Sequence, residues 1–166
     1  VTGYPVIFGS SMKGCLRYKG VQTWKEKQAL TDTLFGSVEQ AGSLAVHDAR
    51  LLLLPVRSLS GHYRWLTCPY VLERLQRDMD MIGLKKVLPE LAVKKGEVWA
   101  EKGERLFLEE LSFSVVVKAE AIRQVADMIK PLLHHTSVQQ RVEKQLVICH
   151  DEEFSYYTKC ALQIQA

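Results

Sequence analysis

The sequence contains no long hydrophobic run. Its longest apolar stretch, residues 51–56, is interrupted by Pro55 and is far shorter than the roughly 20 apolar residues of a membrane-spanning helix. The first residues, Val-Thr-Gly-Tyr-Pro, lack the basic region and apolar stretch of a secretory signal peptide. We therefore expect a cytoplasmic protein that makes no contact with a membrane.

The residue spacings of common ligand sites are also missing. A phosphate-binding Gly-x-x-x-x-Gly-Lys-Ser/Thr loop is absent, because Lys13 precedes Gly14. The pair His134-His135 has no carboxylate or cysteine at ligand spacing, so we interpret it as favourable charge at a helix C-terminus and expect no metal site. Zinc and redox spacings are absent from the four cysteines, which we expect to be buried reduced thiols. These are Cys15, Cys68, Cys149 and Cys160.

No strong excess of charge is present either. The formal net charge is +3, with 47% hydrophobic and 25% charged residues, which is ordinary for a globular domain. This charge is compatible with nucleic-acid binding but does not argue for it alone. We expect residues 1–166 to form a single domain. Val1 is not a methionine, and residues 162–166 stop inside an alternating pattern, so both ends are interpreted as truncation points.

Helical and strand patterns alternate along the chain. Helices are expected over residues 12–21, 69–82, 119–133 and from Asp151 onward; strands are expected over 43–56, 62–67, 106–117, 146–149 and from Leu162 onward. Turn residues at 58–61 make the first two strands a hairpin. The order helix, hairpin, helix predicts an α+β fold with a ferredoxin-like unit, whose first strand would lie upstream of Val1. RNA-recognition domains use the same arrangement.

Residues 85–105 are interpreted as an insertion projecting from the core, because they are polar and broken by Pro89, Gly96 and Gly103. Basic and aromatic residues occur together there, which suits contact with single-stranded nucleic acid by charge and stacking. These residues are Lys94, Lys95, Trp99, Lys102 and Arg105. The alternative is a mobile surface loop.

The start of the first expected helix carries a candidate anion site. Lys13 and Arg17 are four residues apart and share a face, and Ser10 and Ser11 are expected to cap the helix. Together with the free N–H groups of the first turn, these side chains could hold a phosphate. Gly14 is unfavourable inside a helix, which indicates that another element or a ligand approaches the backbone. A solvated basic helix with an ordinary cap is the alternative.

A second polar group lies on the expected strand over 43–56. Asp48 and Arg50 point to the same side of a strand and His47 to the other, so we expect a structural ion pair between Asp48 and Arg50. Around the hairpin turn, Arg57, His62 and Arg64 could touch phosphate or face solvent.

Several strings of residues resemble one protein family. Residues 5–17, Pro-Val-Ile-Phe-Gly-Ser-Ser-Met-Lys-Gly-Cys-Leu-Arg, are similar to a signature of the RAMP superfamily of CRISPR proteins, and Leu34-Phe35-Gly36 matches its next marker. Residues 41–58 and 65–69 narrow the likeness to the backbone subunit of type III-B (Cmr) effector complexes. Residues 108–111 and 150–154 also recur in that family. The resemblance covers nearly the whole chain.

This resemblance implies a function. Backbone subunits of this family stack into a filament along a guide RNA, with a ferredoxin-like palm and a thumb, and support cleavage of the paired target RNA. The implied RNA-binding residues are Ser10, Ser11, Lys13, Gly14, Arg17 and Arg57. The implied chemistry is a metal-dependent endoribonuclease that acts only in the assembled complex, with Mg²⁺ or Mn²⁺ and a catalytic Asp upstream of Val1. The implied partners are guide RNA, target RNA, further copies of the chain and other Cmr subunits.

Two alternatives remain open. One is a non-catalytic RNA-binding scaffold of a related CRISPR complex. The other is an unrelated α+β enzyme or interaction domain that mimics the motif.

Overall fold

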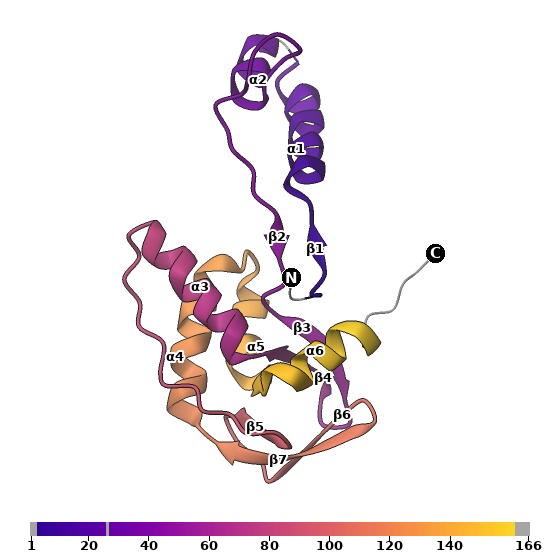
Figure 1. Ribbon diagram of the computed structural model, residues 1–166, viewed down its shortest axis with the longest axis vertical. Helices are drawn as coiled ribbons and strands as arrows, with labels where there is room; N and C mark the ends of the chain where they lie inside the picture. Colours follow the sequence, from indigo (N-terminus) through magenta and orange to yellow (C-terminus); the bar gives the residue numbers. More distant parts are fainter. Residues whose placement is uncertain (1–2, 26, 162–166) are drawn as a thin grey trace. The chain divides into compact units, whose positions relative to one another are not determined.

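The computed structural model describes residues 3–25 and 27–161 (Figure 1). Two compact units divide the chain: Pro5–Leu51, here called the helical unit, and Val1–Tyr4 with Leu52–Ala166, here called the barrel unit.

The barrel unit is built on six strands: β3 (Leu54–Ser58), β4 (His62–Thr67), β5 (Glu97–Ala100), β6 (Arg105–Leu108), β7 (Leu111–Val117) and β8 (Leu146–Cys149). They close in the order β3-β4-β8-β5-β7-β6. The pairs β4–β8 and β5–β7 are parallel and the remaining pairs are antiparallel. Along β3, Leu54, Val56 and Ser58 are buried whereas Pro55 and Arg57 are exposed, which is the alternation that a half-buried strand requires.

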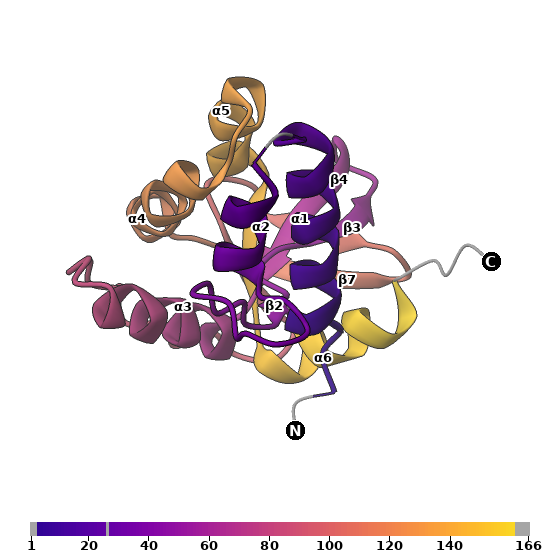
Figure 2. The same cartoon turned by 90° about the horizontal axis from the view of Figure 1, so that it is seen from above.

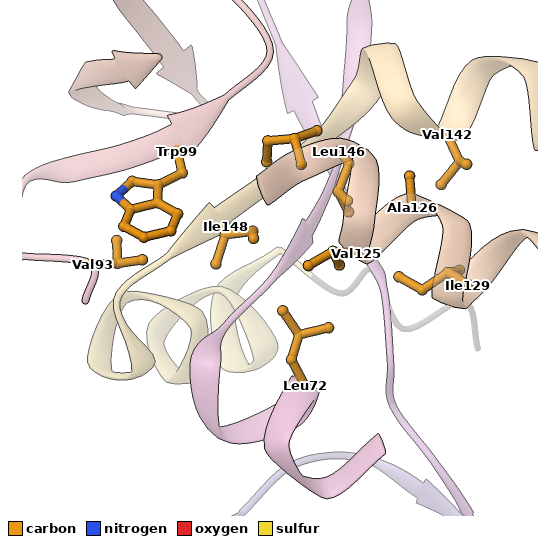
Figure 3. Close-up of a cluster of buried hydrophobic side chains, with 10 residues drawn as sticks. Leu72, Val93, Trp99, Val125, Ala126, Ile129, Val142, Leu146 and Ile148 are labelled. Carbon is orange, nitrogen blue, oxygen red and sulfur yellow. The ribbon is translucent and has the colours of Figure 1, made fainter. Parts of the chain in front are cut away.

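Helices pack on this barrel through an apolar cluster. They are α3 (Pro69–Met81), α4 (Ala119–Ile129), α5 (Thr136–Gln145) and α6 (Asp151–Cys160), with the 3-10 turn η1 (Lys130–Leu132) after α4. Figure 3 shows Leu72 of α3 and the stripe of α4 facing β8. The helix predicted over 119–133 is observed as α4 and η1, and it buries one stripe: Ile122, Val125, Ala126 and Ile129 are all 0% exposed.

Helix α6 buries two aromatic side chains in the barrel unit. Phe154 and Tyr157 are completely buried, and the Tyr157 hydroxyl donates to the Leu108 carbonyl at 2.9 Å. The helix begins with a capping box, in which the His150 ring accepts from the Glu152 N–H and the Glu153 carboxylate accepts from the His150 N–H. The predicted helix from Asp151 is therefore confirmed, and its start is determined by local side chains.

The helical unit contains β1 (Val6–Ile7), α1 (Gly9–Thr23), α2 (Gln28–Phe35) and β2 (Ala49–Arg50). Strands β1 and β2 pair antiparallel, with Val6 opposite Arg50. Figure 2 shows α1 and α2 lying side by side. Apart from the glycines Gly9, Gly20 and Gly36, only Thr31 is buried among the described residues of this unit.

The α+β class is confirmed, but several expected elements differ. The strand predicted over 43–56 is two pieces, β2 and β3, and the strand predicted over 106–117 is the hairpin β6–β7, which turns at Glu109 with a φ of 47°. The ferredoxin-like unit stays a prediction; in the described residues β4 pairs in parallel with β8. Helices α2 and α5 were not predicted. The strand expected from Leu162 lies outside the described residues.

The interpretation of residues 97–100 as part of a projecting segment is wrong. They form β5 between β8 and β7, and Trp99 is 7% exposed, so Trp99 cannot stack on RNA. The expectation of four buried thiols is also wrong in part, since Cys15 and Cys160 are exposed. Burial raises the pKa of Cys68 to about 12 and raises that of Cys149 well above its usual value, so these two thiols stay protonated and unreactive. No helix in the described ranges is long and apolar enough to cross a membrane.

Candidate nucleic-acid interface

The N-terminus of α1 is held by a carboxylate from a distant part of the chain. Helix α1 begins at Gly9, and the Asp48 carboxylate accepts a hydrogen bond from the Gly9 N–H at 2.8 Å. Ser10 and Ser11 therefore lie inside the first turn, and the prediction that they cap the helix is wrong: the N-cap residue is Phe8, which makes no side-chain cap. The expected ion pair between Asp48 and Arg50 is not observed within residues 3–25 and 27–161.

Four donors of the first turn form no hydrogen bond with the described residues. The first N–H groups of a helix have no intrahelical partner; here Asp48 takes that of Gly9, and the Phe8 carbonyl takes that of Met12 at 3.0 Å. The N–H groups and hydroxyls of Ser10 and Ser11 form no hydrogen bond with any described residue, and both residues are exposed. The first turn of α1 thus presents four donors to an anion.

The two cations of the predicted site have different surroundings. Arg17 Nη2 donates to Asp32 Oδ1 of α2 at 3.0 Å, and the side chains of the pair are 42% and 34% exposed. Lys13 is half-buried and forms no ion pair in the described part of the chain. Lys13 is therefore the cation free for a ligand, whereas Arg17 also links α1 to α2.

Close backbone approach explains the glycines of the motif strings at Gly9 and Gly42. A Cβ on Gly9 would lie 2.3 Å from the Val46 carbonyl oxygen, and one on Gly42 would lie 2.4 Å from the Phe35 carbonyl carbon. Any larger residue would force these backbone segments apart. Gly14 is different, because a Cβ added there would meet no described atom within 4 Å.

The motif strings at 34–36 and 41–44 have a structural role. The N–H groups of Ser43 and Leu44 donate to the carbonyls of Thr33 and Leu34, each at 2.9 Å, and Gly36 forms an isolated bridge with Ala41. These bonds satisfy carbonyls at the end of α2 that the helix leaves unpaired. Backbone hydrogen bonds therefore join the two motif strings to each other at the end of α2.

Arg57 belongs to the barrel unit and lies at the junction between β3 and β6. Its Nε donates to both carboxylate oxygens of Glu109 at 3.1 Å, and the Glu109 N–H donates to the Arg57 carbonyl at 3.0 Å. The Arg57 side chain is 75% exposed. Since β3 and β6 share a single register pair, Ser58 with Leu108, these bonds extend the closure of the barrel.

The other candidate residues are less suited to a ligand. Arg64 Nη1 donates to the Lys144 carbonyl at 2.7 Å and burial lowers its pKa, so this side chain has a structural role. His62 is exposed at the hairpin turn. The rings of His134 and His135 follow η1 and lie 5.2 Å apart. No group of three His, Cys, Asp or Glu that could hold a metal ion occurs among the described residues.

Sequence patterns did not reveal Asp48 as the anchor of α1 or the exposed Tyr18 on its outer face. Asp48 is 39 residues from its partner, and no local signal reports such a distant contact. Tyr18 could have been found, since it lies four residues after Gly14 on the same helix face.

The fold and this basic first helix identify the class of protein. The chain belongs to the RAMP superfamily, whose family model matches residues 1–145. It is 30% identical over 178 residues to the CRISPR system Cmr endoribonuclease Cmr4 of Pyrococcus furiosus, an alignment that covers 99% of this chain and 59% of that protein.

Solved structures of Cmr4 are also similar to this chain. The structure of oligomeric Cmr4 from Pyrococcus furiosus matches with a TM-score of 0.87 at 28% identity, over 98% of this chain and 66% of that chain. A second Cmr4 structure matches at 0.83 and 27% identity, over 98% and 64%. A chain of the type III-B Cmr-beta complex bound to cognate target RNA shares the fold, with a TM-score of 0.66 at 16% identity, over 95% and 57%. The chain thus spans less than two thirds of each of these relatives.

Proposed function

We propose that this chain is part of a type III-B CRISPR backbone subunit that binds guide RNA along α1 and supports cleavage of the paired target RNA. The observation that carries the proposal is Gly14. It is exposed, no described atom lies near the position of its missing Cβ, and a glycine inside a helix costs about 1 kcal/mol relative to alanine. A ligand that approaches the backbone closely is a physical reason for it.

The residues around Gly14 suit a phosphodiester chain. Ser10 and Ser11 offer four exposed donors, and Lys13 and Arg17 place positive charge beside them. Contacts of this kind read no base, which suits a guide protein because base pairing supplies sequence specificity. Arg57 is proposed as a further phosphate contact from the barrel unit, since Glu109 engages its Nε and its side chain is largely exposed.

Cleavage is proposed on the basis of the similarity to the Pyrococcus furiosus Cmr endoribonuclease Cmr4. The proposed catalytic Asp lies upstream of Val1, and the cofactor is Mg²⁺ or Mn²⁺. The described residues contain no cluster suited to a metal, so no catalytic step is assigned to them. Their role is to hold the guide and thereby position the duplex.

The proposed partners follow from the same comparison. They are guide RNA, target RNA, further copies of the subunit and other Cmr subunits, in the cytoplasm. An oligomeric Cmr4 is known from Pyrococcus furiosus. The β3–β4 hairpin and α3 are proposed to belong to the ferredoxin-like palm of the complete subunit.

A non-catalytic scaffold is the second candidate function, favoured by the absence, among the described residues, of any group of three His, Cys, Asp or Glu that could hold a metal ion. The two candidates differ in one assay. The full-length subunit is assembled with its partners and a defined guide, then mixed with labelled complementary RNA and Mg²⁺. Regularly spaced cuts that disappear when the Asp upstream of Val1 is replaced support the endoribonuclease. Tight target binding without cuts supports the scaffold.

A further inference from the structure

Tyr18 lies on the outer face of α1, in line with the free first turn. Ser11, Gly14 and Tyr18 are spaced i, i+3 and i+7, so they share one face of the helix, and all three are exposed. Tyr18 is 66% exposed.

No aromatic ring of the described residues packs against the Tyr18 ring. Tyr4, Tyr63, Tyr70, Tyr156 and Tyr157 each pack against another aromatic ring. Among the residues that the structure describes, Tyr18 alone of the six tyrosines has a side chain with neither a ring contact nor a hydrogen bond. An aromatic ring that is largely exposed and contacts no other described ring is a ready contact surface for a ligand.

The charge of α1 favours an anionic ligand. Its sequence contains Lys13, Arg17 and Lys19 and no acidic residue. A polyanion with flat aromatic groups, which is what single-stranded RNA is, complements both the charge and the exposed ring.

We propose that Tyr18 is a stacking platform for one nucleobase of the bound RNA. The RNA backbone crosses α1 at Gly14, a phosphate lies at the donors of Ser10 and Ser11, and the base one step along rests on the Tyr18 ring. This proposal rests on the proposed function and adds a positioning residue to it. Every base has a flat face, so the contact orients a nucleotide without selecting its sequence.

The test uses the full-length subunit and single-stranded RNA of mixed sequence, with 2-aminopurine placed at successive positions. The variants are Tyr18→Leu, which keeps apolar bulk but removes the ring, and Tyr18→Phe, which keeps the ring. We expect Tyr18→Leu to weaken RNA binding by roughly 5- to 150-fold, since loss of one stacked base has that effect. Fluorescence quenching should persist at one labelled position in the wild type and in Tyr18→Phe, and should be lost in Tyr18→Leu.

Phe107→Leu is the matched control, because Phe107 is an exposed aromatic residue (39%) of the barrel unit. Unfolding in urea establishes that each variant is folded. Unchanged affinity and quenching in Tyr18→Leu would overturn the proposal. So would a Tyr18→Leu variant that changes self-association in sedimentation but not RNA binding, since Tyr18 would then be a protein contact.

The variant Lys13→Ala distinguishes failure of the stacking proposal from failure of the proposed function on which it rests. If Lys13→Ala weakens binding and Tyr18→Leu does not, RNA lies on α1 but the stacking contact is wrong. If neither variant changes binding, the proposed interface on α1 is itself wrong.

Discussion

The Asp48 carboxylate accepts a hydrogen bond from the Gly9 N–H at 2.8 Å, across 39 residues of sequence. This bond joins the segment before β2 to the first turn of α1. A Cβ on Gly9 would lie 2.3 Å from the Val46 carbonyl oxygen, so the two segments are in backbone contact at the same point. The position of the candidate phosphate site therefore depends on a residue that is not part of it.

Replacing Asp48 with alanine should destabilise the protein by about 0.5–2 kcal/mol, the usual cost of losing a helix N-terminal acceptor. Asp48→Asn keeps an acceptor oxygen and should cost less. Urea unfolding of the full-length protein measures both changes. Glu39→Ala is the control, because Glu39 is an exposed acidic residue of the same unit. Equal stability of the wild type and Asp48→Ala would contradict the role given to this bond.

Gly14→Ala should raise stability and lower RNA affinity together. Alanine is favoured over glycine in a helix by about 0.5–1 kcal/mol, and the added methyl group meets no described atom. The same methyl group would occupy the space proposed for the RNA backbone. Thermal unfolding and RNA titration measure the two effects.

Gly9→Ala is the matched comparison for Gly14→Ala. At Gly9 the methyl group collides with backbone, so stability should fall. If Gly14→Ala is stabilised and binds RNA like the wild type, close approach of RNA at Gly14 is ruled out.

Lys13→Ala should weaken binding of unrelated RNA sequences by the same factor. It should also lower the slope of log affinity against log salt by about 0.7, the value for one phosphate contact on a single strand. Lys13 is a cleaner test than Arg17, because removing Arg17 also leaves Asp32 without its ion-pair partner. The control is Lys159→Ala, an exposed lysine of the barrel unit. A salt slope unchanged by Lys13→Ala would contradict a phosphate contact.

Local patterns in the sequence predicted the elements whose burial repeats along the chain. The spacing of Ile122, Val125 and Ile129 predicted α4 because a helix buries one stripe. The alternation over 43–56 correctly indicated extended backbone in part, but an alternating pattern does not report whether a partner strand lies alongside. Residues 44–48 have none within the described residues. The turn at Glu109 was missed because a left-handed glutamate carries no glycine or asparagine signal.

Contacts between distant residues explain the remaining errors. Trp99 looked like a surface aromatic because lysines surround it in sequence, yet β5 pairs with β7 and β8 and buries it. In the candidate site, the spacing of Lys13 and Arg17 was readable from the sequence. The carboxylates that contact this helix, Asp32 and Asp48, could be identified only from the fold.

Glu143 of α5 should contribute stability that is lost in acid. Its carboxylate accepts from Lys130 at 3.0 Å and pairs with Arg123 at 3.4 Å. The hydrogen bond from Lys130 lowers the pKa of Glu143 from its usual 4.5. The contribution is therefore complete above about pH 4.5 and disappears as the pH falls through the lowered folded-state pKa.

The measurement is the difference in unfolding free energy between wild type and Glu143→Gln across pH. We expect about 1 kcal/mol near pH 7, since two partly exposed ion pairs each contribute a fraction of this, and a smaller difference in acid. Glu90→Gln, at an exposed glutamate, should show no such dependence. A difference that stays constant from pH 7 to pH 3 would show that the ion pairs do not stabilise the α4–α5 contact.

The variants of Arg57 and Glu109 should differ in RNA binding, because only Arg57 is proposed to touch RNA. Arg57→Gln and Glu109→Gln each remove the same ion pair, so each should cost about 0.2–1 kcal/mol of stability. Only Arg57→Gln also removes a phosphate contact, so it alone should lower the salt slope of RNA binding, by about 0.7. Urea unfolding and RNA titration at several salt concentrations give both quantities for each variant. If the two variants have equal salt slopes, Arg57 makes no phosphate contact. Its role is then the ion pair with Glu109, which extends the closure of the barrel.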